Sequence, residues 1–111
     1  MSNLAALGVD ELWPVGFCGS DGEGYELYRA LEQTPGVHMK YFFESEDQAT
    51  FTYCKPLMMH LGQPPEELNR LDSKNWHPTP VNLQHQLANA VRSLAYEVDA
   101  IIVLDQADAP E

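Results

Sequence analysis

Two cations in an acidic chain, Lys55 and Arg70, are the residues best suited to hold an anion. An arginine guanidinium binds phosphate or carboxylate through two parallel hydrogen bonds, and a lysine adds a point charge. Only six residues are basic against 17 acidic ones, and four of the six fall in the middle third, at Lys40, Lys55, Arg70 and Lys74. If that segment folds over a ligand, it brings most of the positive charge. The alternative is a surface lysine and an ion pair of Arg70 with Asp72 or Glu66.

Two carboxylates, Asp21 and Asp105, follow segments that are expected to place them near a ligand. Asp21 lies in a glycine-rich turn, where it orders a binding loop or, alternatively, stands at the first position of a capped helix and favours its dipole. Asp105 ends an apolar run, and ligands of open α/β sheets bind beyond the carboxyl ends of strands. Its alternative role is a simple strand-end cap. The glycines around Asp21 match neither the P-loop nor the dinucleotide-binding spacing.

Other site chemistries have little support in the sequence. The histidines have no short metal-ligand spacing with one another or with the two cysteines, so no zinc site is expected; they are His38, His60, His77 and His85. Cys18 and Cys54 are expected to be free thiols. No serine lies in the strand–turn–helix motif of a hydrolase nucleophile.

Composition bounds the class of protein. The chain of 111 residues is about one small domain long, and its 44% of hydrophobic residues can form a small core. A formal net charge of −11 disfavours nucleic acid and anionic membranes as partners, because both require a basic face. No apolar run approaches the roughly 20 residues that cross a bilayer, and the first residues lack the basic region of a signal peptide. A cytoplasmic location is therefore expected.

The periodicity of apolar residues predicts an α/β fold with βαβ character and an inserted β element. A capping box of Ser20 and Glu23 predicts the start of the second helix. The strands at 37–43 and 49–58 form a hairpin or join different sheets. The expected helices cover residues 1–8, 20–34 and 81–97, the expected strands cover 11–17, 37–43, 49–58 and 100–104, and residues 63–80 are expected to be irregular.

Four short motifs follow one another along the chain. The helix end Leu-Ala-Ala-Leu-Gly at 4–8 precedes a Gly-x-x-Gly-x-Asp-x-x-Gly turn at 16–24. A Thr-x-x-Lys strand at 52–55 is followed by Arg-x-Asp at 70–72, and the last strand ends in aspartate at 105. In this order they resemble the front half of a PfkB-type, ribokinase-like carbohydrate kinase of the heptose-kinase branch. Each motif is weak alone, and together they are moderately specific. The resemblance covers essentially the whole chain but only the N-terminal part of the family's fold.

The resemblance implies a partial three-layer fold, a single incomplete domain over residues 1–111, with a β lid and the following irregular segment at 36–80. It implies a parent activity that transfers the γ-phosphate of Mg-ATP to a sugar or sugar phosphate, largely by positioning and electrostatics. It places Lys55, Arg70, Asp21 and Asp105 on the substrate side, with no catalytic and no metal-binding residue. The family's Gly-Gly-x-x-Asn stretch and its catalytic base are not found, so this chain alone is expected to be inactive and to need no cofactor. The alternative is a non-catalytic module that binds sugar phosphates or dimerises.

Self-association is a further expectation. The strand at 100–104 is apolar throughout, which is typical of a strand covered on both faces. A partial sheet would leave such faces bare, and large bare apolar patches are rare. Because an open sheet edge accepts a partner strand, a homo-oligomer is expected through the lid strands or the exposed sheet.

Overall fold

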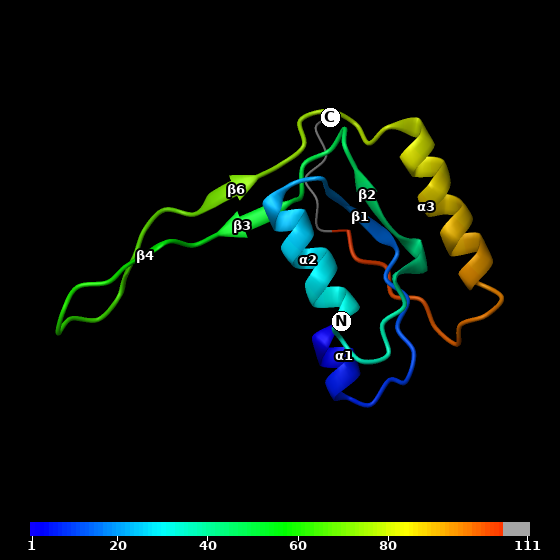
Figure 1. The fold of residues 1–111 in the computed structure, drawn as a ribbon, viewed down its shortest axis with the longest axis horizontal. Coiled ribbons are helices and arrows are strands. Elements are labelled where there is room, and N and C mark those ends of the chain that lie inside the picture. Colours follow the sequence, from blue (N-terminus) through cyan, green and yellow to red (C-terminus); the bar gives the residue numbers. More distant parts are fainter. Residues whose placement is uncertain (106–111) are drawn as a thin grey trace.

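The computed structural model describes residues 1–105 as a mixed α/β body from which a long β-hairpin projects. The described residues form three α-helices and three two-stranded sheets. The molecule measures 55 × 37 × 22 Å, and the hairpin extends along its longest axis (Figure 1). The expected α/β class is confirmed. Within the described residues, no helix has both the length and the apolar character that crossing a membrane requires.

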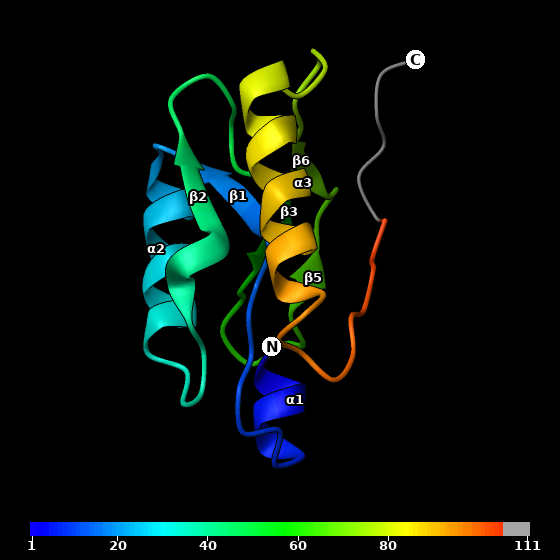
Figure 2. The same ribbon diagram turned by 90° about the vertical axis from the view of Figure 1, so that its right-hand side faces the viewer.

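The body is built around a parallel pair of strands, β1 (Gly16–Gly19) and β2 (Phe42–Ser45). Helix α2 (Gly22–Glu32) connects them in a βαβ unit, and a 3₁₀ turn (Met39–Tyr41) leads into β2. Figures 1 and 2 show β1 and β2 between α2 and α3 (Val81–Leu94). A helix on each side of a parallel pair covers both faces, which explains why Cys18 of β1 is completely buried.

Helix α3 contributes most of the described core. Leu83, Ala90 and Leu94 are buried and recur at helical spacing on one face of the helix that was expected at 81–97. Near the other end of the sheet, Leu12 forms a single parallel bridge with Val37. Trp13 stacks on the ring of His38 with 4.2 Å between ring centroids, beside that bridge. The short helix α1 (Ser2–Ala6) buries no residue.

The projecting hairpin, residues 52–73, is called the arm below. Its two ladders are antiparallel: β3 (Thr52–Cys54) pairs with β6 (Leu71–Ser73), and β4 (Leu57–Met58) pairs with β5 (Glu66–Glu67). The predicted strand at 49–58 therefore pairs with a segment that was expected to be irregular, and not with residues 37–43. Local sequence hid this because β5 and β6 are too short to show a clear alternation.

Three local predictions are wrong. The expected strand at 11–17 is reduced to the bridge at Leu12, with β1 beginning at residue 16. Helix α2 is capped by Asp21 and not by Ser20, whose hydroxyl donates instead to Glu44 at 2.6 Å. The expected strand at 100–104 is not formed, and no described strand pairs with this segment. Figure 2 shows this segment set apart from β1 and β2.

Candidate functional site

The carboxyl ends of β1 and β2 meet at one edge of the body, where Gly19 is in register with Ser45. This is the position at which open α/β sheets bind ligands. The glycine-rich turn leaves β1 here, and residues 46–51 leave β2 and lead to the arm. Ser20 and Glu44 bridge the two strand ends on the exposed side by the 2.6 Å hydrogen bond. The candidate site is therefore this edge together with the arm that leads away from it.

Asp21 is the centre of a polar cluster that closes the turn. Its Oδ1 accepts from the Gly24 amide at 2.7 Å and from the Thr50 hydroxyl at 2.6 Å, and its Oδ2 accepts from the Thr50 amide at 2.8 Å. The Thr50 hydroxyl in turn accepts from the Gly19 amide at 2.8 Å. The two hydrogen bonds from Thr50, followed by that from Gly24, hold the pKa of the Asp21 carboxyl below its ordinary value of 3.8. The carboxylate is thus committed to protein donors, which favours the structural role of Asp21.

Two glycines make this cluster possible. A Cβ on Gly24 would collide with the carbonyl oxygen of Gly19 and lie 2.8 Å from the Thr50 hydroxyl. A Cβ on Gly19 would collide with the carbonyl oxygen of Gln48. Glycine is needed at both positions because backbone approaches backbone there, and not because a ligand does.

The chain that leaves β2 is buried at two polar residues, Gln48 and Thr50, which are 8% and 6% exposed. Thr50 is fully satisfied by the Asp21 cluster, but the side-chain oxygen of Gln48 has no hydrogen-bond partner among the described residues. Ala49, between these two residues, is bonded to Asn75. The Asn75 side-chain NH₂ group donates to the carbonyl oxygen of Ala49, and the Asn75 side-chain oxygen accepts from the backbone N–H of Ala49, both at 2.8 Å. These contacts tie the strand entering the arm to the strand leaving it.

The structure brings Lys55 and Arg70 together on the arm. The antiparallel register pairs Cys54 with Leu71, and continuing it by one residue sets Lys55 opposite Arg70. Each cation has an acidic neighbour: Lys55 lies 3.6 Å from Glu67, and Arg70 binds Asp72 through Nε at 2.8 Å and through Nη2 at 2.9 Å. The Arg70 guanidinium also stands over the ring of Tyr53, 5.0 Å from its centroid.

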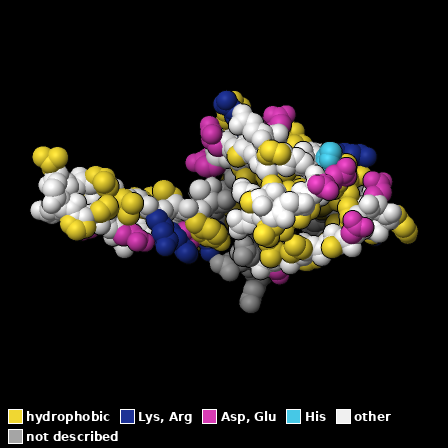
Figure 3. Space-filling model, turned by 90° about the horizontal axis from the view of Figure 1, so that it is seen from below, with side chains coloured by type: hydrophobic (Ala, Val, Ile, Leu, Met, Phe, Trp, Pro, Cys, Tyr) yellow, Lys and Arg dark blue, Asp and Glu magenta, His cyan; other side chains and the backbone are white. Residues whose placement is uncertain are grey.

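The Arg70–Asp72 ion pair that the sequence offered as an alternative is therefore present. Figure 3 shows the Lys and Arg side chains of the arm gathered beside acidic ones. Both cations remain more than half exposed, with side-chain exposures of 63% and 53%. The exposed Lys55–Glu67 pair contributes about 1 kcal/mol or less, so an anionic ligand can replace Glu67, whereas the Asp72 side chain is only 20% exposed and holds Arg70 through two hydrogen bonds.

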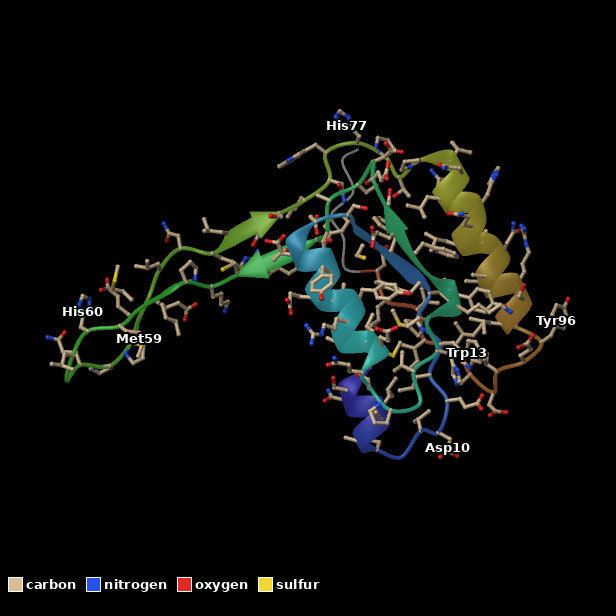
Figure 4. All side chains as sticks on the ribbon, in the orientation of Figure 1. Asp10, Trp13, Met59, His60, His77 and Tyr96 are labelled. Atoms are coloured by element: carbon tan, nitrogen blue, oxygen red, sulfur yellow. The ribbon has the colours of Figure 1, made fainter. Side chains whose placement is uncertain are left out.

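The other predicted residues lie elsewhere. Asp105 is exposed in the extended segment after α3 and follows no strand. Figure 4 shows His60 near the tip of the arm and His77 beyond its base, and no group of three or more His, Cys, Asp or Glu side chains among residues 1–105 could hold a metal ion. Cys18 and Cys54 are free thiols, as expected.

Apolar side chains also gather on the arm. Six of them, all well exposed, lie along residues 57–71: Leu57, Met58, Met59, Leu61, Leu68 and Leu71. The segment after α3 adds Ile101, Ile102, Val103 and Leu104, which are 49–84% exposed. The sequence predicted that these residues would be covered on both faces of a strand, and they are not. Uncovered apolar surface of this extent usually marks a contact with another molecule.

Comparison with known protein families, curated proteins and solved structures gave no match in any of the three.

Sequence reasoning did not find Gln48, Thr50 or Asn75. None of them stands in a motif, and the hydrogen-bond partners of Thr50 and Asn75 are 26 to 31 residues away along the chain. The only local sign was the glycine spacing of the turn at 16–24. It indicates close packing at the turn but does not identify the residues that pack against it.

Proposed function

We propose that this chain is the substrate side of a PfkB-type carbohydrate kinase, whose parent activity is ATP-dependent phosphorylation of a sugar or sugar phosphate. The observation that supports the proposal most is the joint placement of three features. A glycine-rich turn follows the first strand of a parallel βαβ unit, the carboxyl ends of both strands are adjacent, and a hairpin carrying two cations rises from that same edge.

Each residue then has a role. Lys55 and Arg70 hold the phosphate or another anionic group of the substrate, with Lys55 exchanging Glu67 for the ligand and Arg70 offering it the guanidinium N–H groups that do not bond Asp72. Asp21 shapes the turn through its three hydrogen bonds and does not touch the substrate. Asp105 is given no role in the proposal, because it follows no strand and the argument that placed it beside the substrate depended on a strand end. Mg-ATP belongs to the family's full fold, and no described residue is assigned to it.

A thermal-shift and calorimetric titration tests this proposal. A panel of sugars, sugar phosphates and inorganic phosphate is added to the protein, and a ligand present at 100 times its Kd stabilises the fold by about 2.7 kcal/mol. A sugar phosphate should raise Tm more than inorganic phosphate does. The double variant Lys55→Gln/Arg70→Gln should lose the part of the shift that depends on phosphate. Arg92→Gln, on the exposed face of α3, is the matched control. A panel in which no sugar or sugar phosphate changes Tm would refute the proposal.

The exposed apolar side chains of the arm favour a second candidate, a module that dimerises through the arm strands. Light scattering separates the two. A dimer that dissociates in a Tyr53→Glu variant, without any sugar-dependent shift in Tm, supports this second candidate, and a monomer rejects it.

A further inference from the structure

The direction in which the arm leaves the body is set at a small joint. The chain enters the arm through residues 49–51 and leaves it through residues 74–76. Apart from one contact of Thr52 with the backbone of Thr50, the hydrogen bonds and ion pairs that the structure shows for residues 52–73 stay inside the hairpin. Figure 1 shows the arm standing clear of α2 and α3.

The first fixed point of the joint is Thr50. Its amide and hydroxyl both donate to Asp21, at 2.8 and 2.6 Å, and its hydroxyl also accepts from the Gly19 amide at 2.8 Å. These bonds attach the entering strand to the end of β1 and to the first turn of α2. The residue is 6% exposed, so water does not compete for these bonds.

The second fixed point is Asn75. Its side-chain amide pairs with both backbone groups of Ala49, each at 2.8 Å, in the way that a neighbouring strand would. This contact fastens the leaving strand to the entering one immediately beside Thr50. The entering strand is therefore attached to the body through Thr50, and the leaving strand is attached to the entering one through Asn75.

We propose that Thr50 and Asn75 are positioning residues that together fix the direction of the arm, and with it the place of Lys55 and Arg70 relative to the body. With both side chains removed, the arm keeps its own ladders and the body keeps its core, but the hydrogen bonds of Thr50 and Asn75 that help to set the angle between them are lost. Because the arm extends along the 55 Å axis, a small rotation at the joint moves its tip a long way. This inference does not depend on what the chain binds.

The chain supplies a label for the test. Cys54 lies exposed on the arm, whereas Cys18 is buried in β1. One nitroxide is attached to Cys54 and a second one to His85→Cys, an exposed position of α3. Pulsed electron paramagnetic resonance then measures the distance between the arm and the body. The labelled protein is diluted into unlabelled protein, so that contacts between copies do not contribute. A single narrow distance peak is expected.

Loss of that narrow peak is expected in Thr50→Val/Asn75→Ala, with unchanged helical circular dichroism. The single variant Thr50→Ser keeps the hydroxyl and should therefore show the same narrow distance peak as the parent protein. Asn82→Ala, at an exposed position of α3, is the control for Asn75→Ala. If Thr50→Val unfolds the body, the width of the distance peak in the single variant Asn75→Ala tests the proposal. A peak that stays narrow in folded Thr50→Val/Asn75→Ala, or in Asn75→Ala where the double variant does not fold, or one that is already broad in the parent protein, overturns the proposal.

Discussion

Replacing Asp21 by asparagine is the sharpest test of the polar cluster, because it changes one oxygen to an NH₂ group with almost no change in shape. Asparagine can still accept from the Gly24 amide and the Thr50 hydroxyl, but its NH₂ group then faces the Thr50 amide, which is also a donor. One hydrogen bond to a charged group is lost, and a buried amide is left without a partner. We expect a loss of about 2 kcal/mol at neutral pH.

In a chain of this length, a loss of that size lowers Tm by about 8 °C. Thermal melts followed by circular dichroism measure it directly. Asp47→Asn is the control, because Asp47 is an exposed carboxylate in the same loop region. This control variant should melt within about 2 °C of the parent protein, since exposed surface substitutions change stability by about 0.5 kcal/mol or less.

The pH dependence gives the same test an internal check. The pKa of Asp21 is lowered by its bonds with Thr50, so the carboxylate stabilises the folded state fully above its ordinary value of 3.8. That contribution is lost as the pH falls through the lower pKa of the folded state. The difference in Tm between the parent protein and Asp21→Asn should therefore be constant near neutral pH and shrink below pH 3.8. Equal stability at neutral pH, or a difference that persists undiminished in acid, would refute the assigned role of Asp21.

Three further outcomes are expected. Gly24→Ala should destabilise the protein by several kcal/mol because its Cβ has no room, whereas Gly22→Ala, with open space around its Cβ, should be neutral or slightly stabilising in chemical denaturation. Gln48→Met should leave Tm unchanged or raise it, because the side-chain oxygen of Gln48 lacks a partner among residues 1–105; a large drop would contradict this. A thiol reagent should label Cys54 at once and Cys18 only on unfolding, because burial first, and then nearby carboxylates, raise the pKa of the Cys18 thiol.

The sequence alone predicted the elements that depend on local periodicity. Helices α2 and α3 lie within the predicted ranges 20–34 and 81–97, α3 from the first predicted residue, because apolar residues at helical spacing define a buried face wherever the helix packs. The prediction of a βαβ unit is also confirmed by the parallel pairing of β1 and β2. Cap identity was less secure: Ser20 and Asp21 are both good capping residues, and only the position of Thr50 makes Asp21 the acceptor.

By itself, the sequence determined the α/β class, the two long helices and the residues that could carry charge to a ligand. The tertiary structure alone decided which strands pair, where the cations lie and what each polar side chain bonds. The pairing of Thr52 with Ser73, the Asn75–Ala49 contact and the Asp21–Thr50 contacts all join residues more than 20 positions apart. Short strands have no periodicity strong enough to choose such partners. The same limit explains residues 101–104, whose composition predicts a buried strand while burial itself depends on a neighbour that the described chain does not provide.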